Sequence, residues 1–246
     1  MQMSVWANRN DLSLSAGSVD SECRDLVVNL DLFTPNLLIN DSPLVWTYIK
    51  NLQDKGEFGQ LSIIMDNIGL ELICDLCLAD FFIHYGLFSK VCFYVKKLPW
   101  FVSDVSSRDF HWTLQQLKND RPDLVGKWLD YLRSGKWQVI EETYWTSPVP
   151  YHLMESLDNR LYQQLSSCKL LIFKGDLNYR KLGADLQWPS DTSFESFLRN
   201  FRPSPLVVMR TLKSEIICGN LETDKLSSQC DNWLVSGEYA VMQFAN

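Results

Sequence analysis

Short apolar segments alternate with amphipathic segments along most of this 246-residue chain. The apolar segments are about four to seven residues long and rich in β-branched and aromatic side chains, as is typical of strands. They predict strands at residues 25–30, 61–65, 91–95, 137–140, 169–173, 206–209 and 239–244.

The segments between these strands carry apolar residues at spacings of three and four, the period of a helix with one buried face. This pattern predicts helices at residues 70–83, 110–119, 123–134 and 154–166. Strands that alternate with helices form mainly parallel sheets that are covered on both faces. The sequence therefore predicts an α/β fold, a three-layer α/β/α arrangement with a mainly parallel central sheet and inserted helices in the segment 100–167.

Composition supports a well-packed domain, because 46% of the residues are hydrophobic and 13% are aromatic. The chain shows no internal repeat and no clear linker. We therefore expect residues 1–246 to form a single domain.

The net charge, the lengths of the apolar stretches and the cysteines indicate which partners and which cellular compartment to expect. The formal net charge of −7 argues against a nucleic-acid partner. No apolar stretch reaches the roughly 20 residues that cross a bilayer, so we expect no membrane partner. The 7 cysteines are odd in number and lie mostly in apolar segments, which indicates free thiols in a reducing compartment. These features predict a cytoplasmic protein.

Two oxygen-bearing side chains, Asp66 and Asn67, lie between the strand 61–65 and the helix that begins at residue 70. In open α/β sheets, ligands bind beyond the carboxyl ends of the strands. The N-terminus of the following helix offers N–H groups that attract phosphate. The pair therefore predicts a site for a hard divalent cation with a phosphate beside it.

Asp104 occupies the corresponding position after the strand 91–95. Neighbouring strands lie about 4.8 Å apart, so side chains at adjacent strand ends can converge on one ion. With Asp66 and Asn67, Asp104 completes an all-oxygen ligand set that favours Mg²⁺ or Mn²⁺ over zinc. Alternatively, each aspartate only caps a helix. Two aspartates at corresponding positions, one of them beside an asparagine, favour the cation site.

Polar residues also follow two later strands. The strand 169–173 is followed by a set suited to gripping a polyol and a phosphate: Gly175, Asp176, Asn178 and Arg180. The strand 206–209 is followed by two cations and a hydroxyl that can neutralise a phosphoryl group: Arg210, Lys213 and Thr211. Both segments can equally be solvated loops.

The four clusters together resemble the metal-dependent damage-control phosphatase family, and within it the sugar-phosphate phosphatase subfamily. The resemblance extends from Trp6 to the end of the chain. It is carried by these motifs: Asp66-Asn67-x-Gly69-x-Glu71 with Asp75-Leu-x-Leu-Ala-Asp80, Lys97-Leu-Pro-Trp-Phe-Val-Ser-Asp104, Lys174-Gly-Asp-Leu-Asn-Tyr-Arg-Lys-Leu182 and Arg210-Thr-Leu-Lys213.

This resemblance implies a catalytic centre in which Asp66, Asn67 and Asp104 hold a divalent metal, with Mn²⁺, Co²⁺ or Ni²⁺ able to serve. It implies that the substrate binds to the same three residues and to six more: Asp176, Leu177, Asn178, Tyr179, Arg180 and Lys213. The implied activity is hydrolysis of small sugar phosphates, such as fructose 1-phosphate and fructose 6-phosphate, in metabolite damage control.

The chain departs from the family pattern in three places. Family members carry a helical region before the segment that matches Trp6, and this chain begins almost there, so we expect that region to be absent. Ala7 stands where the family pattern has glycine. Gly183-Ala184-Asp185 stands where the pattern has Thr-Gly-Asp.

Two alternative functions stay open. One is S-adenosylmethionine-dependent methylation of glutamates on a protein substrate, an activity ascribed to this branch of the family. The strand-to-helix turn has only Gly69, without a glycine-rich cofactor loop, and calorimetry with S-adenosylmethionine against sugar phosphate plus Mn²⁺ separates the two activities. The other is a shortened, weakly active or non-catalytic form that acts through interactions, for which exposed core surface predicts self-association.

Overall fold

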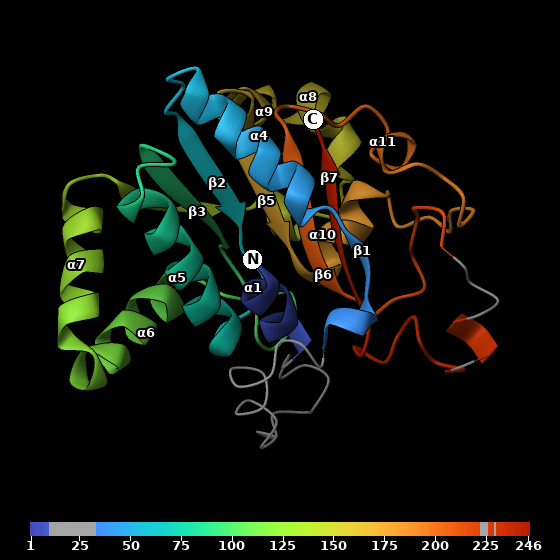
Figure 1. Cartoon of the computed structure of the whole chain (residues 1–246), viewed down its shortest axis with the longest axis horizontal. Coiled ribbons are helices and arrows are strands. Elements are labelled where there is room, and N and C mark those ends of the chain that lie inside the picture. Colours follow the sequence, from blue (N-terminus) through green and yellow to red (C-terminus); the bar gives the residue numbers. More distant parts are fainter. Residues whose placement is uncertain (10–32, 222–225, 229) are drawn as a thin grey trace.

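The computed structural model describes residues 1–9, 33–221, 226–228 and 230–246 (Figure 1). Its centre is a 7-stranded sheet in the order β1-β7-β6-β5-β2-β3-β4. All neighbouring strands run parallel except β6 and β7, which are antiparallel. The predicted mainly parallel sheet is confirmed. Its strands are β1 (Leu37–Asn40), β2 (Gln60–Ile64), β3 (Lys90–Lys96), β4 (Trp137–Glu142), β5 (Leu170–Lys174), β6 (Leu206–Thr211) and β7 (Ala240–Ala245).

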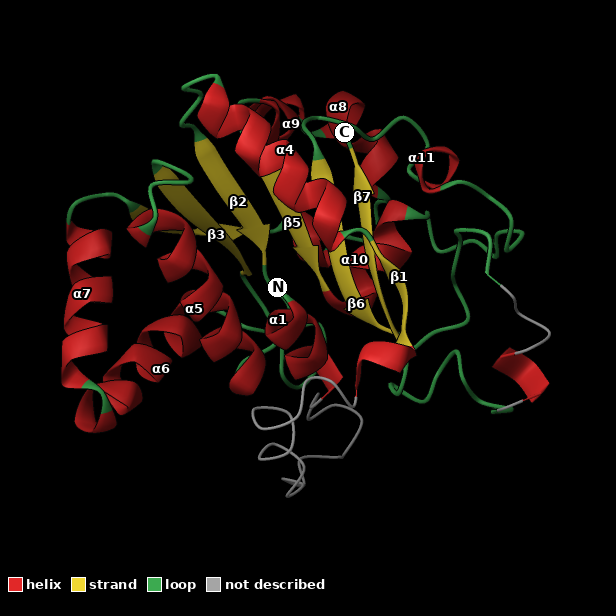
Figure 2. Cartoon of the chain, in the orientation of Figure 1, coloured by secondary structure: helices red, strands yellow, loops and turns green. Residues whose placement is uncertain are grey.

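Helices cover both faces of the sheet, as Figure 2 shows. None of the described helices is long and apolar enough to cross a bilayer. One face is covered by α1 (Gln2–Trp6), α4 (Ser42–Asp54), α5 (Leu70–His84), α6 (Ser107–Asp120) and α7 (Pro122–Arg133). The other is covered by α8 (Met154–Leu157), α9 (Asn159–Ser166), α10 (Gly175–Leu182) and α11 (Phe194–Phe197).

Alternate residues along the strands enter two separate hydrophobic cores. Ile63 of β2 and Ile172 of β5 pack with the helices of the first face, while Ile64 and Phe173 pack with those of the second. This is the period of two that a pleated strand imposes on its side chains. Both faces of the sheet are therefore buried, and the three-layer α/β/α arrangement is confirmed.

The predicted strands from 61–65 onward correspond to β2 to β7, whereas the predicted strand 25–30 lies outside the described residues. Strand β1 and helix α4 are present in the structure but are not among the predicted elements. Pro43 near the start of α4 and the apolar spacing of Val45, Ile49 and Leu52 are the signals that indicate this helix.

Two helical segments differ in detail from their prediction. The predicted helix 154–166 is divided into α8 and α9 at Asp158, whose side chain accepts a hydrogen bond from the Leu161 N–H. The segment after β5, for which the sequence leaves a solvated loop open, forms helix α10 although glycine, aspartate and asparagine favour turns. Burial of Tyr179 and Leu182 in the second core outweighs that local preference.

The order of the strands creates a topological switch point between the ends of β2 and β5. These two strands are parallel neighbours. The chain leaves β2 through α5 on one face of the sheet and leaves β5 through α10 on the other face. Such a topological switch point is where open α/β sheets bind ligands. It places the segment after Ile64 beside the first turn of α10.

Lys181 of α10 anchors the helix to the chain that follows β4. Its ammonium donates to the backbone oxygens of Tyr144 at 2.7 Å, Trp145 at 3.1 Å and Ser147 at 2.9 Å. The ammonium also lies 4.9 Å from the centre of the Tyr151 ring. All three N–H donors of the group are thereby used inside the protein.

Replacement of Lys181 by methionine should lower the free energy of unfolding by about 2 kcal/mol, because the buried carbonyls lose their donor. Urea unfolding measures this change. The exposed Lys55, changed to methionine in the same way, should shift stability by less than about 0.5 kcal/mol. Equal effects of the two substitutions would show that Lys181 does not anchor α10.

Candidate active site

The carboxylates of Asp66 and Asp104 meet around one buried lysine at the ends of β2 and β3. The Lys96 ammonium lies 3.2 Å from Asp66 Oδ1 and 2.5 Å from Asp104 Oδ1. The second oxygen of Asp104 accepts the backbone N–H groups of Trp100 at 2.6 Å and Phe101 at 2.7 Å. All three charged residues are at most 5% exposed. The two carboxylates are therefore fixed in place, facing each other.

Asn67 directly follows Asp66 in the chain, and its backbone forms an isolated antiparallel bridge with Asp104. Its Oδ1 accepts a hydrogen bond from Ser103 Oγ at 2.8 Å. Its Nδ2 donates to Asp66 Oδ2 at 3.0 Å and to Glu71 Oε2 at 3.1 Å. The structure thus brings together Asp66, Asn67 and Asp104, the three residues predicted to form the centre.

A second layer of buried charge lies behind Asp66. The Lys174 ammonium donates to Asp75 Oδ1 at 2.9 Å and to the Ser4 backbone oxygen at 2.6 Å, and lies 3.3 Å from Glu71 Oε1. Burial raises the pKa of Glu71 to about 7 and also raises the pKa of Asp75. Glu71 Oε1 and Asp75 Oδ2 have no hydrogen-bond partner within the described chain. The single positive charge of Lys174 therefore cannot neutralise both carboxylates when both are ionised.

The two layers together hold more buried acids than buried bases. Burial also raises the pKa of the Asp104 carboxyl. When all groups are ionised, the excess of two negative charges equals the charge of one divalent cation. The groups concerned are the carboxylates of Asp66, Glu71, Asp75 and Asp104 and the ammonium groups of Lys96 and Lys174.

The donor set also limits how a cation could bind. The part of the chain that the structure describes contains no group of three or more His, Cys, Asp or Glu side chains able to hold a metal ion. A cation at the ends of β2 and β3 would therefore need the amide oxygen of Asn67 in addition to Asp66 and Asp104. It would share the carboxylate oxygens with Lys96, which their several lone pairs allow.

Gly175 lets the first turn of α10 approach Asp66 closely. A Cβ atom at this position would lie 1.7 Å from Asp66 Oδ2, and the residue has φ +81°. Only glycine meets both the steric and the conformational requirement. The N-terminus of α10, where helices favour negative charge, therefore lies directly against the carboxylate.

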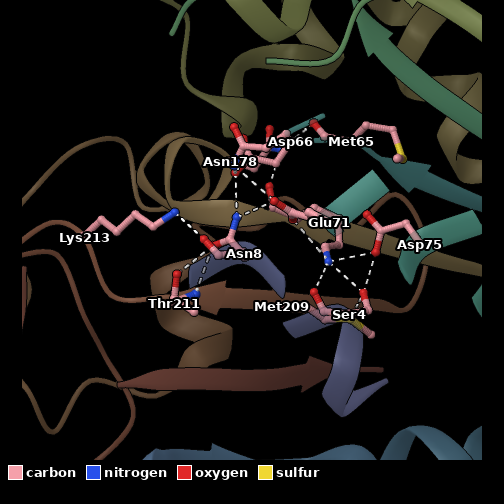
Figure 3. Close-up of polar contacts among 12 residues, drawn as sticks. Ser4, Asn8, Met65, Asp66, Glu71, Asp75, Asn178, Met209, Thr211 and Lys213 are labelled. Carbon is pink, nitrogen blue, oxygen red and sulfur yellow. Dashed lines mark hydrogen bonds and ion pairs between the residues drawn. The ribbon is translucent and has the colours of Figure 1, made fainter. Parts of the chain in front are cut away.

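Asn8, near the N-terminus, joins the acidic layer to the end of β6 (Figure 3). Its Nδ2 donates to Asp66 Oδ2 at 2.9 Å and to Glu71 Oε2 at 2.8 Å. Its Oδ1 accepts the Thr211 Oγ1 hydroxyl at 2.8 Å and the Thr211 N–H at 3.2 Å. Its backbone oxygen accepts the Lys213 ammonium at 2.6 Å. Asp66 and Lys213 are thereby both bonded to the same residue.

Asp176 bonds to the end of β6. Its Oδ1 accepts Arg210 Nε at 2.7 Å, Ser214 Oγ at 3.2 Å and the Lys213 backbone N–H at 3.3 Å. The Arg210 guanidinium is fully buried and also donates to the Ile216 backbone oxygen. In this arrangement Asp176 secures the segment that carries Lys213.

Asn178 and Tyr179 are fully buried, and their side chains bond to other parts of the protein. Asn178 Oδ1 accepts the Tyr151 hydroxyl at 2.5 Å, and its Nδ2 donates to the Lys174 backbone oxygen at 2.7 Å. The Tyr179 hydroxyl donates to Gln243 Oε1 at 2.9 Å. In these positions both side chains hold α10 against its neighbours.

Leu177 and Arg180 line a cavity of about 230 Å³. Trp100 forms part of its wall, and the Trp100 N–H bonds to Asp104, which links the cavity to the acidic centre. The Arg180 guanidinium is paired in a fork with Asp185 at 2.7 and 3.0 Å. This cavity brings two of the predicted substrate-binding residues to the edge of the centre.

A larger apolar hollow of about 880 Å³ lies among α1, α4 and α5. Trp46 and Phe81 in its lining are 39% and 41% exposed. This is exposed core surface of the kind on which the expectation of self-association rests. Self-association stays a prediction.

Several residues that contact the predicted centre are not among the predicted site residues, including Glu71, Lys96 and Asn8. Glu71 lies one helical turn after Asn67 in the same motif, so its position was a usable signal. Lys96 is one of two adjacent lysines, which are too few to indicate a basic stripe. Asn8 bonds to residues 58 and 203 positions away, and no local pattern reveals such contacts.

The ends of β2 and β3 form an acidic strand-end site of an α/β protein, with a helix N-terminus and a lysine beside the carboxylates. The family model of the damage-control phosphatase ARMT1-like domain matches residues 1–227. This chain belongs to that family.

Relatives include proteins named "Damage-control phosphatase ARMT1" from several vertebrates. The Bos taurus protein is 37% identical over 253 residues and the Homo sapiens protein is 36% identical over 253 residues, in each case covering 99% of this chain. The Danio rerio protein is 37% identical over 256 residues and covers 100% of this chain. The chain spans 57% of the length of each of these relatives.

Replacement of Gly175 by alanine should destabilise the protein by about 3 kcal/mol, of which about 1 comes from the positive φ and about 2 from the clash with Asp66. Gly56, with φ +69° and nothing within 4 Å of its added Cβ, is the matched control and should lose only about 1 kcal/mol. Urea unfolding of both variants measures the difference. Equal losses would mean that α10 does not need to approach Asp66.

Proposed function

We propose that this chain is a divalent-metal-dependent phosphatase that hydrolyses sugar phosphates, such as fructose 1-phosphate and fructose 6-phosphate, in metabolite damage control. The observation that carries the proposal is the convergence of Asp66, Asn67 and Asp104 within a buried cluster that holds two more carboxyl groups than lysine side chains. Such a centre suits a divalent cation and, through it, an anionic substrate.

The three residues would hold the ion through two carboxylates and one amide oxygen. All are hard oxygen ligands, which fits Mn²⁺ or Mg²⁺, with Ni²⁺ and Co²⁺ as further candidates. The bound ion would neutralise and polarise phosphoryl oxygens. The Nδ2 bonds of Asn67 to Asp66 and Glu71 fix its amide with the oxygen at Ser103 Oγ, so a bound ion would share this oxygen with the Ser103 hydroxyl.

Two positively charged features near Asp66 would bind the phosphate, and a neighbouring cavity would bind the sugar. The Lys213 ammonium bonds to the Asn8 carbonyl at 2.6 Å, and its positive charge would attract a phosphoryl oxygen. The first turn of α10 presents the positive end of a helix beside Asp66. Leu177 and Arg180 would contact the sugar in the adjoining cavity. In a loose, in-line transfer these positive groups offset the charge on the phosphoryl oxygens.

Support for this activity also comes from the family. The relatives reported above are named as damage-control phosphatases, and they match this chain over nearly its whole length. The proposed substrates are small molecules, with no nucleic acid or membrane as partner, and the proposed location is the cytoplasm. Glutamate methylation and a non-catalytic interaction role stay predictions from the sequence.

Phosphate release from a panel of phosphosugars, with and without Mn²⁺, tests the proposal. Metal-dependent release should be highest with the fructose phosphates. Absence of release with Mn²⁺, Co²⁺, Ni²⁺ and Mg²⁺ alike would refute the proposed activity for this chain.

Replacement of Asp104 by alanine should abolish the metal-dependent release, because one of only two carboxylate ligands is lost. Asp104→Asn is a second variant that keeps the side-chain shape and an acceptor for the Trp100 and Phe101 N–H groups. The exposed Asp130, changed to alanine, serves as the control and should keep full activity. Full turnover of a folded Asp104 variant in Mn²⁺ would eliminate this residue as a ligand.

A further inference from the structure

We propose that Asn8 is a positioning residue, which sets the orientation of Asp66 for cation binding and fixes Lys213 at a constant distance from it. This proposal rests on the function proposed above, because it assigns Asn8 to the cation and phosphate sites of that centre. Asn8 itself need not touch either ligand. Its role follows from the hydrogen bonds of one fully buried amide group.

Every polar atom of the Asn8 side chain takes part in hydrogen bonds, and these bonds fit only one orientation of the amide group. The two Nδ2 hydrogens go to two carboxylate oxygens, those of Asp66 and Glu71. The Oδ1 accepts two donors, both from Thr211. Rotation of the amide by 180° would set its NH₂ group against the Thr211 donors and its oxygen against the carboxylates. The buried polar contacts therefore determine which way the amide points.

This orientation controls Asp66. Its Oδ2 is held by two donors, Asn8 Nδ2 at 2.9 Å and Asn67 Nδ2 at 3.0 Å, and lies against Gly175. The other oxygen, Oδ1, is thereby directed toward Lys96 and Asp104, where the cation would bind. Partners of this kind orient a metal ligand without touching the metal, and their loss typically weakens binding.

The backbone of Asn8 contacts the basic group of the site, Lys213. Its carbonyl oxygen accepts the Lys213 ammonium, while its side chain holds Asp66. One residue thus connects the acidic group to the basic group across the site. Because the carbonyl belongs to the main chain, side-chain variants of Asn8 should disturb Asp66 and leave the anchor of Lys213 in place.

A purely structural role, in which Asn8 only secures the N-terminal segment, makes a different prediction. Ser4 provides the matched control, because it is also buried near the N-terminus and bonds to charged groups. Its hydroxyl donates to Asp75 Oδ1 at 2.5 Å and accepts the Lys174 ammonium at 2.7 Å. Its hydrogen bonds do not reach Asp66. Ser4→Ala should therefore loosen the segment without reorienting Asp66.

The experiment measures Mn²⁺ binding through the electron paramagnetic resonance signal of free Mn²⁺, for the wild type and for Asn8→Ala, Asn8→Leu and Ser4→Ala. Urea unfolding of each variant reports on the fold, and the leucine variant fills the space that alanine leaves. In Asn8→Ala the Kd for Mn²⁺ should rise about 10–100-fold. In Ser4→Ala it should stay within about threefold of the wild-type value, although stability falls. The KM for fructose 1-phosphate should change less than about threefold in Asn8→Ala, since Lys213 keeps its carbonyl partner.

A folded Asn8 variant that binds Mn²⁺ with the wild-type Kd would overturn the proposal. An equal loss of binding in Ser4→Ala would also overturn it, because the effect would then belong to the segment as a whole. Because Mn²⁺ binding is measured separately from phosphate release, failure of the Asn8 proposal can be distinguished from failure of the proposed phosphatase activity. A wild-type chain that binds Mn²⁺ but releases no phosphate would refute the phosphatase activity, while the comparison of Kd values would still decide the role of Asn8.

Discussion

The buried concentration of negative charge at the ends of β2 and β3 is the constraint on which the rest of the site depends. An ionised carboxylate taken out of water costs several kcal/mol unless cations and hydrogen-bond donors surround it. Lys96 faces Asp66 and Asp104, and Lys174 faces Glu71 and Asp75. When all four carboxylates are ionised, these two lysines leave an excess of two negative charges, which a divalent cation would offset. Burial raises the pKa of Glu71 to about 7, and the neighbouring carboxylates of Asp66 and Asp75 add to this rise.

The fold supplies this arrangement by bringing together segments that are far apart in the sequence. Adjacent parallel strands deliver Asp66 and Asp104, and the switch point between β2 and β5 places the first turn of α10 beside them. Gly175 permits the close contact, and Asn8 links the acids to the end of β6. The centre is therefore a product of sheet topology, because no single segment contains it.

Much of the fold could be predicted because hydrophobic residues recur with a period of two in strands and of 3.6 in helices. The candidate residues Asp66, Asn67 and Asp104 could be found because each follows a recognisable strand, and parallel strands end at a common edge. Helix α10 was missed because its composition is that of a turn and its helical state depends on burial of Tyr179 and Leu182. Asn8 could not be found at all, since its partners lie 58 and 203 residues away. Local patterns reveal which residues follow a strand, but the partners that orient them depend on the assembled sheet.

The central claim, that Asp66, Asn67 and Asp104 share one divalent cation, is tested most directly by anomalous X-ray scattering from crystals of the protein with Mn²⁺. We expect one strong Mn²⁺ peak within bonding distance of oxygens from all three side chains. The Lys96 ammonium should then either leave its place between the two carboxylates or share their oxygens with the ion. A Mn²⁺ peak elsewhere in the protein, with Lys96 still the sole cation between Asp66 and Asp104, would contradict it.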